Sequence, residues 1–302
     1  MGENSKIEWT DATWNPVTGC SVVSPGCTNC YAMRLAGTRM KHHPSRAGLT
    51  VSSKAGPVWN GEVRLNLEWI DEPLRWKRPR RIFACAHGDL FHENVPDDWI
   101  DRVFAVMALA PQHTFQVLTK RADRMRAYVN SDRAWANLEH EICRAVTKYG
   151  VRTRLFQTVE HPLPNVHLGV SAEDQRRADE RIPDLLATPA AVRFASVEPL
   201  LGPVDLTPWL ARRYESYICG WNQGQPAYTV GALKPRLDWV IVGGESGPGA
   251  RVWDGFYDAA RSLRDQCRAA SVAFYMKQTQ GVAKRSMPPI PDDLMIREFP
   301  HT

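Results

Sequence analysis

Short apolar runs alternate along this chain with longer segments whose apolar residues recur at helical spacing. Eight runs have the length expected of strands: Thr13–Thr18, Glu62–Leu67, Arg81–Ala86, Thr114–Leu118, Val166–Val170, Val192–Val197, Leu237–Val242 and Val272–Met276. Several of them are continuously apolar, which is typical of parallel strands that are buried on both faces.

The segments between these strands predict amphipathic helices. The first follows Asp97 and Asp98, which are suited to begin a helix. Three helices are predicted from apolar residues that share one face: Trp99, Val103, Phe104 and Met107; Trp135, Leu138, Ile142 and Val146; and Phe256, Ala260, Leu263 and Cys267. A fourth, less regular helix contains Leu185 and Leu186.

Strand–helix alternation over this length predicts a parallel (β/α) barrel, complete or partial, of the TIM-barrel type. The 302 residues, 43% of them hydrophobic, can bury a large core, and we interpret residues 1–302 as a single domain. Two stretches rich in helix-breaking residues, near 41–60 and 206–235, are predicted insertions.

Composition places this domain in the cytoplasm. No apolar run approaches the roughly 18 residues that a membrane helix needs, and the N-terminus lacks the apolar core of a secretory signal. The seven cysteines are an odd number and are clustered, which is not the pattern of a secreted disulfide scaffold. We therefore expect a cytoplasmic protein with no membrane partner.

The cysteine cluster is the main candidate for chemistry. Cys20, Cys27 and Cys30 lie within eleven residues, in a loop punctuated by Gly and Pro. Three thiolates are suited to a 4Fe–4S cluster whose fourth iron stays open, or to zinc with His42 or His43 as the fourth ligand. The third interpretation is a set of free or disulfide-bonded surface thiols, and the spacing alone leaves all three open.

If the fold is such a barrel, the polar motifs lie at the same edge of the sheet, because the active-site residues of such barrels lie on loops at the carboxyl ends of the strands. Strand-end carboxylates recur at four places, at Asp89, Glu173, Glu198 and Glu245. Any one of them has a structural alternative, as a helix cap or a hydrogen-bond partner. Their recurrence favours a site.

Several of these motifs together are similar to a phage-associated three-cysteine family of unassigned function, itself resembling the radical S-adenosylmethionine (radical SAM) enzymes. The matching stretches run along most of the chain: Lys6 to Cys20, Ser24-Pro25-Gly26-Cys27, Asn29-Cys30-Tyr31-Ala32, Gly88 to His92, Leu118 to Arg121, Gly169 to Asp174, Ser196 to Gly202 and Gly243 to Gly247. The loop departs from the usual radical SAM spacing, since the gap between its first two cysteines is six residues instead of three.

The resemblance implies an iron–sulfur enzyme with a TIM-barrel-like fold, in which Cys20, Cys27 and Cys30 bind a 4Fe–4S cluster. The enzyme would cleave S-adenosylmethionine to a 5′-deoxyadenosyl radical that modifies or repairs a substrate, and it would need an external one-electron donor. Asp89 would accept a hydrogen bond from the cofactor ammonium, and Ser171 with Glu173 would hold its ribose.

The remaining polar groups of the barrel would then face the substrate. Glu198, Glu245 and Lys277 are candidates for proton transfer or orientation. Cys85, near the end of its strand, is either a hydrogen-atom donor or a small buried apolar residue.

Two basic segments suggest that the substrate is a nucleic acid or a nucleotide. One segment runs from Arg75 to Arg81 and the other includes Lys120 and Arg121. The residues proposed to contact phosphates and bases are Arg75, Trp76, Lys77, Arg78, Lys120 and Arg121, joined by Arg124 and Arg126. We expect the two segments to flank one barrel mouth. The structural alternative pairs these cations with nearby acids, among them Asp71, Glu72 and Asp123.

Two other classes of function remain open. One is a zinc-stabilised nucleic-acid-binding protein without catalysis. The other is a metal-dependent nuclease that uses Asp89, Glu198 and Glu245.

Overall fold

A seven-stranded parallel sheet forms the centre of the computed structural model, which describes residues 5–149, 160–218, 221–222, 225–226, 229–282 and 287–300. Its strands are β1 (Ala12–Trp14), β6 (Arg81–Ala84), β7 (Thr114–Thr119), β8 (Val166–Ser171), β9 (Val192–Val197), β14 (Trp239–Gly243) and β15 (Ala273–Gln278). They lie side by side in chain order and every neighbouring pair is parallel. The sheet curls into a half-barrel, which confirms the predicted parallel α/β architecture in its partial form.

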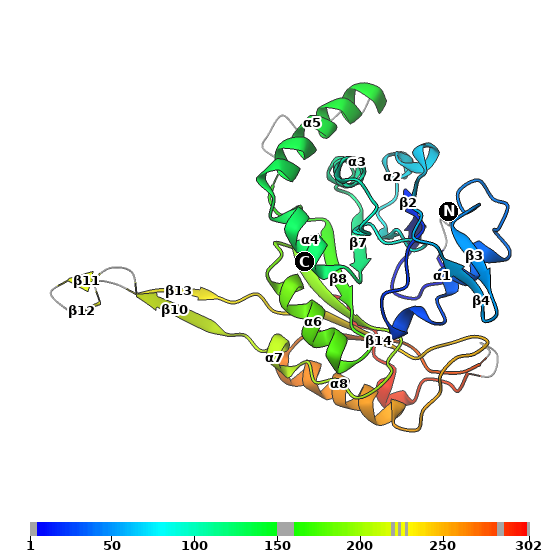
Figure 1. Cartoon of the computed structure of the whole chain (residues 1–302). Helices are drawn as coiled ribbons and strands as arrows, with labels where there is room; N and C mark the ends of the chain where they lie inside the picture. The colour runs from blue at the N-terminus through cyan, green and yellow to red at the C-terminus, as the bar shows by residue number, and fades with distance from the viewer. Residues whose placement is uncertain are drawn as a thin grey trace.

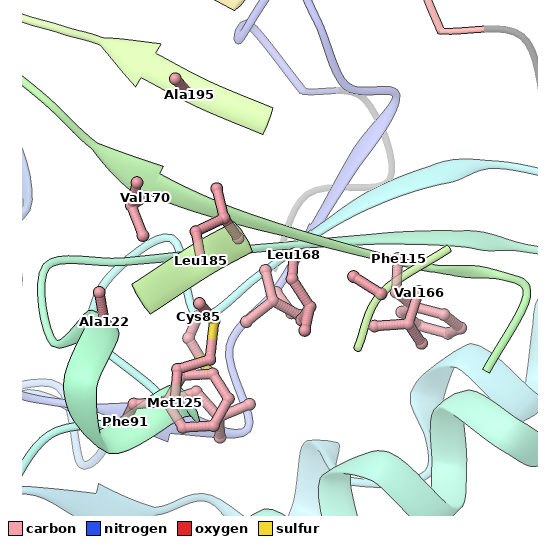
Figure 2. Packing of buried hydrophobic residues seen from close by; sticks show 14 of the residues in the cluster. Cys85, Phe91, Phe115, Ala122, Met125, Val166, Leu168, Val170, Leu185 and Ala195 are labelled. Carbon is pink, nitrogen blue, oxygen red and sulfur yellow. The ribbon is translucent and has the colours of Figure 1, made fainter. Parts of the chain in front are cut away.

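The two faces of the sheet bury two different apolar layers. Side chains of the convex face, such as Val117, Leu168 and Val242, pack against the helices in the largest core cluster. Figure 2 shows part of this layer around Phe115, Val166 and Leu185. The concave face holds a second cluster, made of Trp9, Phe194, Trp239, Ile241 and Tyr275. Burial on both faces explains why the strand sequences are continuously apolar.

The concave face leaves little space between its strands. A methyl group added to Gly169 of β8 would lie 2.5 Å from the ring of Phe194 on the neighbouring strand β9. Glycine is therefore required there for the aromatic ring to lie flat against the sheet.

Five long helices lie around the convex side of the sheet (Figure 1): α3 (Asp97–Leu109), α4 (Ala122–Val129), α5 (Asp132–Tyr149), α6 (Gln175–Leu186) and α8 (Phe256–Ala270). Residues from each of them enter the core cluster, which confirms the predicted apolar segments of α3, α5, α6 and α8, whereas α4 was not predicted. Asp174 caps the start of α6, where its carboxylate accepts a hydrogen bond of 2.9 Å from the Arg177 N–H.

Two predicted strands were wrong in extent or in partner. The run Thr13–Thr18 divides into β1 and β2 (Val17–Thr18) at Pro16, which has no N–H with which to continue a ladder. Only β5 (Arg64–Leu65) forms within Glu62–Leu67, and it pairs antiparallel with β2 outside the main sheet. The alternating polar and apolar residues of 62–67 therefore belong to a small two-stranded ribbon that is separate from the main sheet.

A smaller layer covers the carboxyl edge of the sheet near its N-terminal strands. It contains the single-turn helix η1 (Pro25–Cys27), helix α1 (Tyr31–Gly37) and the antiparallel hairpin of β3 (Thr50–Ser53) and β4 (Gly56–Trp59). The hairpin falls in the stretch predicted as an insertion. Its Trp59 packs with α1 in a third apolar cluster, against which Cys20 and Cys30 lie.

The stretch 206–235 contains the short helix α7 (Thr207–Leu210) and a hairpin of β10 (Tyr214–Ile218) and β13 (Thr229–Leu233). The short strands β11 (Trp221–Asn222) and β12 (Gln225–Pro226) pair at its tip, and the hairpin projects away from the sheet (Figure 1).

Short elements complete the chain. They are η2 (Leu67–Trp69) and α2 (Glu72–Arg75) before β6, and η4 (Asp292–Leu294) near the C-terminus. After η4 the chain lies along the outer strand β15, where the Met276 N–H donates to Ile296 O at 2.8 Å. None of the helices in the described ranges combines the length and the apolar character that crossing a membrane requires.

Candidate functional site

A pocket with a volume of about 270 Å³ opens at the carboxyl edge of the sheet, between the strand ends and the cysteine loop. Most of the predicted site residues line it: Cys20, Cys27, Cys30, Cys85, Asp89, Lys120, Arg121, Ser171, Glu198, Glu245 and Lys277. The parallel strands bring these residues together because their carboxyl ends all meet at one edge.

The three cysteines of the loop share this pocket but differ in surroundings. Cys27 is buried, Cys20 and Cys30 are half-buried, and all three are free thiols. Burial, reinforced by the Asp89 carboxylate, raises the pKa of Cys20 to about 12. Cys27 Sγ lies 3.9 Å from Ser24 Oγ, a weak hydrogen bond at most.

A single-ion site is not preformed in the part of the chain that the structure describes. No three His, Cys, Asp or Glu side chains within it converge closely enough to hold a metal ion. The predicted fourth zinc ligands also lie elsewhere, since neither His42 nor His43 lines the pocket. His43 Nδ1 instead lies 2.7 Å from Ser45 Oγ.

Glu173 holds the cysteine loop from beneath and does not line the pocket, contrary to its predicted ribose contact. It is fully buried, and its carboxylate accepts hydrogen bonds from Gly26 N at 3.1 Å and from Arg181 Nη1 at 2.9 Å. Although burial opposes the charge, Lys120 and Arg181 hold the pKa of Glu173 at about 2. A methyl group on Gly26 would lie 2.9 Å from the Glu173 carboxyl carbon, so this close approach requires glycine.

Glu245 anchors the same loop from the far side of the sheet. Its Oε2 accepts hydrogen bonds from Asn29 Nδ2 at 2.9 Å and from Arg251 N at 2.7 Å. Arg251 also donates to Pro25 O at 3.0 Å. Burial opposes the charge, but Arg251 and Asn29 keep the pKa of Glu245 below its usual range. Glu245 therefore borders the pocket as a carboxylate that is already engaged.

Asp89 lies in the pocket wall with its acceptor positions occupied. Its Oδ1 accepts from Thr119 Oγ1 at 2.7 Å and from Phe91 N at 3.0 Å. Its Oδ2 accepts from Lys120 N and Arg121 Nη1, both at 3.1 Å. Since a carboxylate offers about four such positions, Asp89 is bound mainly to its own protein neighbours.

Lys277 and Glu198 form an ion pair on the concave side of the pocket. Lys277 Nζ lies 2.8 Å from Glu198 Oε1, and Ser196 Oγ donates to Glu198 Oε2 at 3.1 Å. A methyl group on Gly243 would lie 2.4 Å from Glu198 Oε1, so glycine leaves room for the carboxylate. An ammonium and a carboxylate in contact can exchange a proton with a bound molecule.

Cys85 combines features of both of its predicted interpretations. It is 3% exposed and belongs to the apolar core cluster that also contains Phe91 and Met125 (Figure 2), yet it also lines the pocket. Its backbone φ of 57° is unusual for a residue other than glycine, and its N–H donates to Trp14 O at 2.7 Å. Burial raises the pKa of Cys85 to about 12, which keeps the thiol protonated at neutral pH.

Sequence reasoning missed a hydrogen-bond chain at the pocket wall. Tyr31 Oη lies 2.8 Å from His87 Nε2, and His87 Nδ1 lies 2.6 Å from Arg46 Nη2. Arg46 can only donate, so Nδ1 is an acceptor and the ring proton lies on Nε2, from which it is donated to Tyr31. Burial and Arg46 lower the pKa of His87 to about 3, consistent with a neutral ring. The Tyr31 proton is thereby left available to a molecule in the pocket.

Little in the sequence indicated these hydrogen bonds between Tyr31, His87 and Arg46. Tyr31 directly follows the third cysteine and His87 precedes the Gly88-Asp89 motif, but nothing local indicates that Arg46 joins them.

The basic run Arg75–Arg81 does not flank the pocket, contrary to our expectation of a shared mouth. It leads into the first residue of β6, at the amino edge of the sheet, whereas Lys120 and Arg121 follow the last residue of β7. Arg75 pairs with Asp71, and Trp76 is half-buried against His113 with Arg80 over its ring. Lys77 and Arg78 are exposed.

The two later arginines of the second segment are held by acids. Arg124 Nη2 lies 3.0 Å from Asp97, and Arg126 Nη1 lies 3.1 Å from Asp184. Pairing with nearby acids, the structural alternative, therefore describes these two side chains, Arg75, and also Arg121, which pairs with Asp89 and Glu93.

Comparison with known proteins gives a family without an assigned activity. A family model described as "protein of unknown function (DUF5131)" matches residues 4–296. No curated protein and no solved structure matches the chain.

Proposed function

Since this chain belongs to the DUF5131 family of proteins of unknown function, its activity has to be argued from the pocket, and we propose that it is a radical SAM-like iron–sulfur enzyme. One observation carries the proposal. Three cysteines of one loop and the charged side chains of five strand ends line a single pocket at the carboxyl edge of the sheet.

The architecture supports the proposal. Parallel strands in unbroken chain order, with helices on the convex side, correspond to part of a TIM-type barrel, whose active sites lie at the carboxyl edge. Radical SAM enzymes have such a barrel, and we propose that the half-barrel here is of that kind.

The donor set fits an iron–sulfur cluster better than a single ion. Thiolates are the usual cluster ligands, and three of them leave one iron open for S-adenosylmethionine. A structural zinc site needs a fourth protein ligand, and neither His42 nor His43 lines the pocket. When bound, the cluster would supply one electron to S-adenosylmethionine, whose cleavage gives a 5′-deoxyadenosyl radical able to abstract hydrogen from a substrate.

The residues of the chain would divide into two groups. Glu173, Asp89 and Glu245 hold the cysteine loop and its neighbours, as their hydrogen bonds indicate. Ser171 is the candidate to contact the cofactor ribose, because it lines the pocket and Glu173 does not.

The second group faces the substrate. The Lys277–Glu198 pair would orient it or move a proton, and the protonated thiol of Cys85 would donate a hydrogen atom.

We propose an anionic nucleotide or nucleic-acid segment as the substrate. Fewer of the predicted contact residues lie at the pocket than the sequence suggested. Of the six residues predicted to contact it, Lys120 and Arg121 line the pocket and the other four lie at the opposite edge. A substrate bound at the pocket would therefore meet Lys120 of the second basic segment, since Arg121 is already held by Asp89 and Glu93.

Anaerobic reconstitution tests the cluster. We expect about four irons and four sulfides per chain, and formation of 5′-deoxyadenosine when the reduced protein meets S-adenosylmethionine. Replacing Cys20, Cys27 or Cys30 by Ala should abolish both. The control Cys143→Ala changes an exposed thiol of α5 and should retain both, as should Cys219→Ala, which lies outside the described residues. Stoichiometric zinc with no iron uptake would contradict the proposal.

A further inference from the structure

Arg121 connects the first cysteine to the strand-end carboxylates. It is 8% exposed, and its guanidinium is surrounded by acceptors. Nε donates to Glu93 Oε2 at 2.9 Å, and Nη2 donates to Ser21 Oγ at 2.6 Å. Nη1 donates both to Asp89 Oδ2 at 3.1 Å and to Cys20 Sγ at 3.4 Å.

The position of this guanidinium is fixed at both ends. The Arg121 N–H donates to Thr119 Oγ1 at 2.9 Å, at the start of α4. Asp89, its main anionic partner, is itself held by three other donors from the protein. Because the guanidinium is planar and its hydrogen bonds diverge, a fixed Asp89 contact also fixes the direction of the N–H that reaches Cys20.

This contact makes the three cysteines unequal. Among the described residues, Cys20 has a charged donor on its sulfur and Cys27 has only the distant Ser24 hydroxyl, whereas Cys30, which like Cys20 lies against the apolar cluster around Trp59, has no such charged donor. Hydrogen bonds to ligating sulfurs are one of the levers by which proteins set cluster potentials, because they stabilise the more electron-rich reduced state.

We propose that Arg121 is a positioning residue that holds Cys20 in the pocket and raises the reduction potential of the cluster bound there. The inference rests on the proposed function, since it concerns the cluster that Cys20 would bind. Arg121 also holds the start of the six-residue gap between Cys20 and Cys27. Its guanidinium donates a hydrogen bond to Ser21, the first residue of that gap.

The test is an anaerobic redox titration of the reconstituted full chain, followed by electron paramagnetic resonance without S-adenosylmethionine. Arg121→Met keeps the unbranched apolar stem of the side chain and removes every donor, and we expect its midpoint potential to be lower than that of the wild type. Arg126→Met is the matched control. It lies in α4, which Arg121 precedes, and loses an ion pair with Asp184 away from the cysteines, so its potential should not change.

A second variant covers the case in which Arg121→Met does not take up iron. Arg121→Lys keeps the charge without the planar set of donors, and its potential should also lie below that of the wild type. Equal potentials in the wild type and whichever Arg121 variants load iron would overturn the inference. If the wild type itself takes up no iron, the proposed function fails first, and iron analysis alone reveals that outcome.

Discussion

At the scale of single residues, the carboxylates of this site act mainly on the protein. Glu173 is the clearest example, because it is fully buried against Arg181 and holds Gly26 of the cysteine loop. Removing one partner of a buried ion pair leaves the other charge without compensation, which is usually far more costly than losing an exposed pair.

We therefore expect Glu173→Gln to lower the free energy of unfolding by about 3–5 kcal/mol, measured by urea denaturation. The control Glu180→Gln removes an exposed partner of Arg176 in the same region and should change the stability by less than about 1 kcal/mol. Equal effects of the two substitutions would show that Glu173 does not hold the loop.

At the scale of elements, the strands were the most predictable part of the chain. Their apolar runs are long, and parallel strands buried on both faces need little else to be recognised. The convergence of strand-end residues on one edge followed from the same pattern. The misplacement of the 75–81 run was avoidable, because the sequence already placed it before a strand and Lys120 after one.

The roles of individual polar residues were less predictable for a physical reason. Glu173 reaches Gly26 across 147 residues of sequence, and Arg46 reaches His87 across 41. Residues so far apart in sequence meet only once the sheet has folded. No local sequence pattern at Glu173 or His87 shows whether the side chain holds a loop or contacts a ligand.

The contact between β8 and β9 gives a prediction at this scale. Gly169→Ala should destabilise the fold by about 1–3 kcal/mol, because the added methyl group meets the Phe194 ring. The double variant Gly169→Ala with Phe194→Leu should be more stable than the sum of the two single effects. Gly202→Ala is the control, since a methyl group there meets nothing within 4 Å. Strict additivity in urea denaturation would contradict the assignment.

At the scale of the whole molecule, burial of neutral histidines makes stability depend on pH. His167 lies inside the half-barrel, 5% exposed, and neither ring nitrogen has a hydrogen-bond partner in the described part of the chain. Burial lowers the pKa of His167 from 6.5 to about 4. The unfolded chain therefore gains a proton at a pH where the folded chain does not.

Above pH 6.5 the buried ring has no titration cost, and as the pH falls from 6.5 toward 4 the folded state is destabilised by up to about 3 kcal/mol. We expect His167→Leu to remove this part of the decline, and to leave stability at pH 7.5 unchanged or higher because no hydrogen bond is lost. Urea midpoints at pH 7.5 and 4.5 measure both effects. His42→Leu, at an exposed position, is the control, and a decline unaltered by His167→Leu would contradict the prediction.

The anchoring of the cysteine loop has a consequence for biosynthesis. Asn29 and its partner Glu245 are separated by 216 residues. At synthesis rates of about 5–20 residues per second, the cysteines leave the ribosome roughly 10–40 s before that anchor exists. During this interval the loop has none of the contacts from the later strands that fix it in the finished fold. The loop can therefore take its final shape only after β14 has joined the sheet.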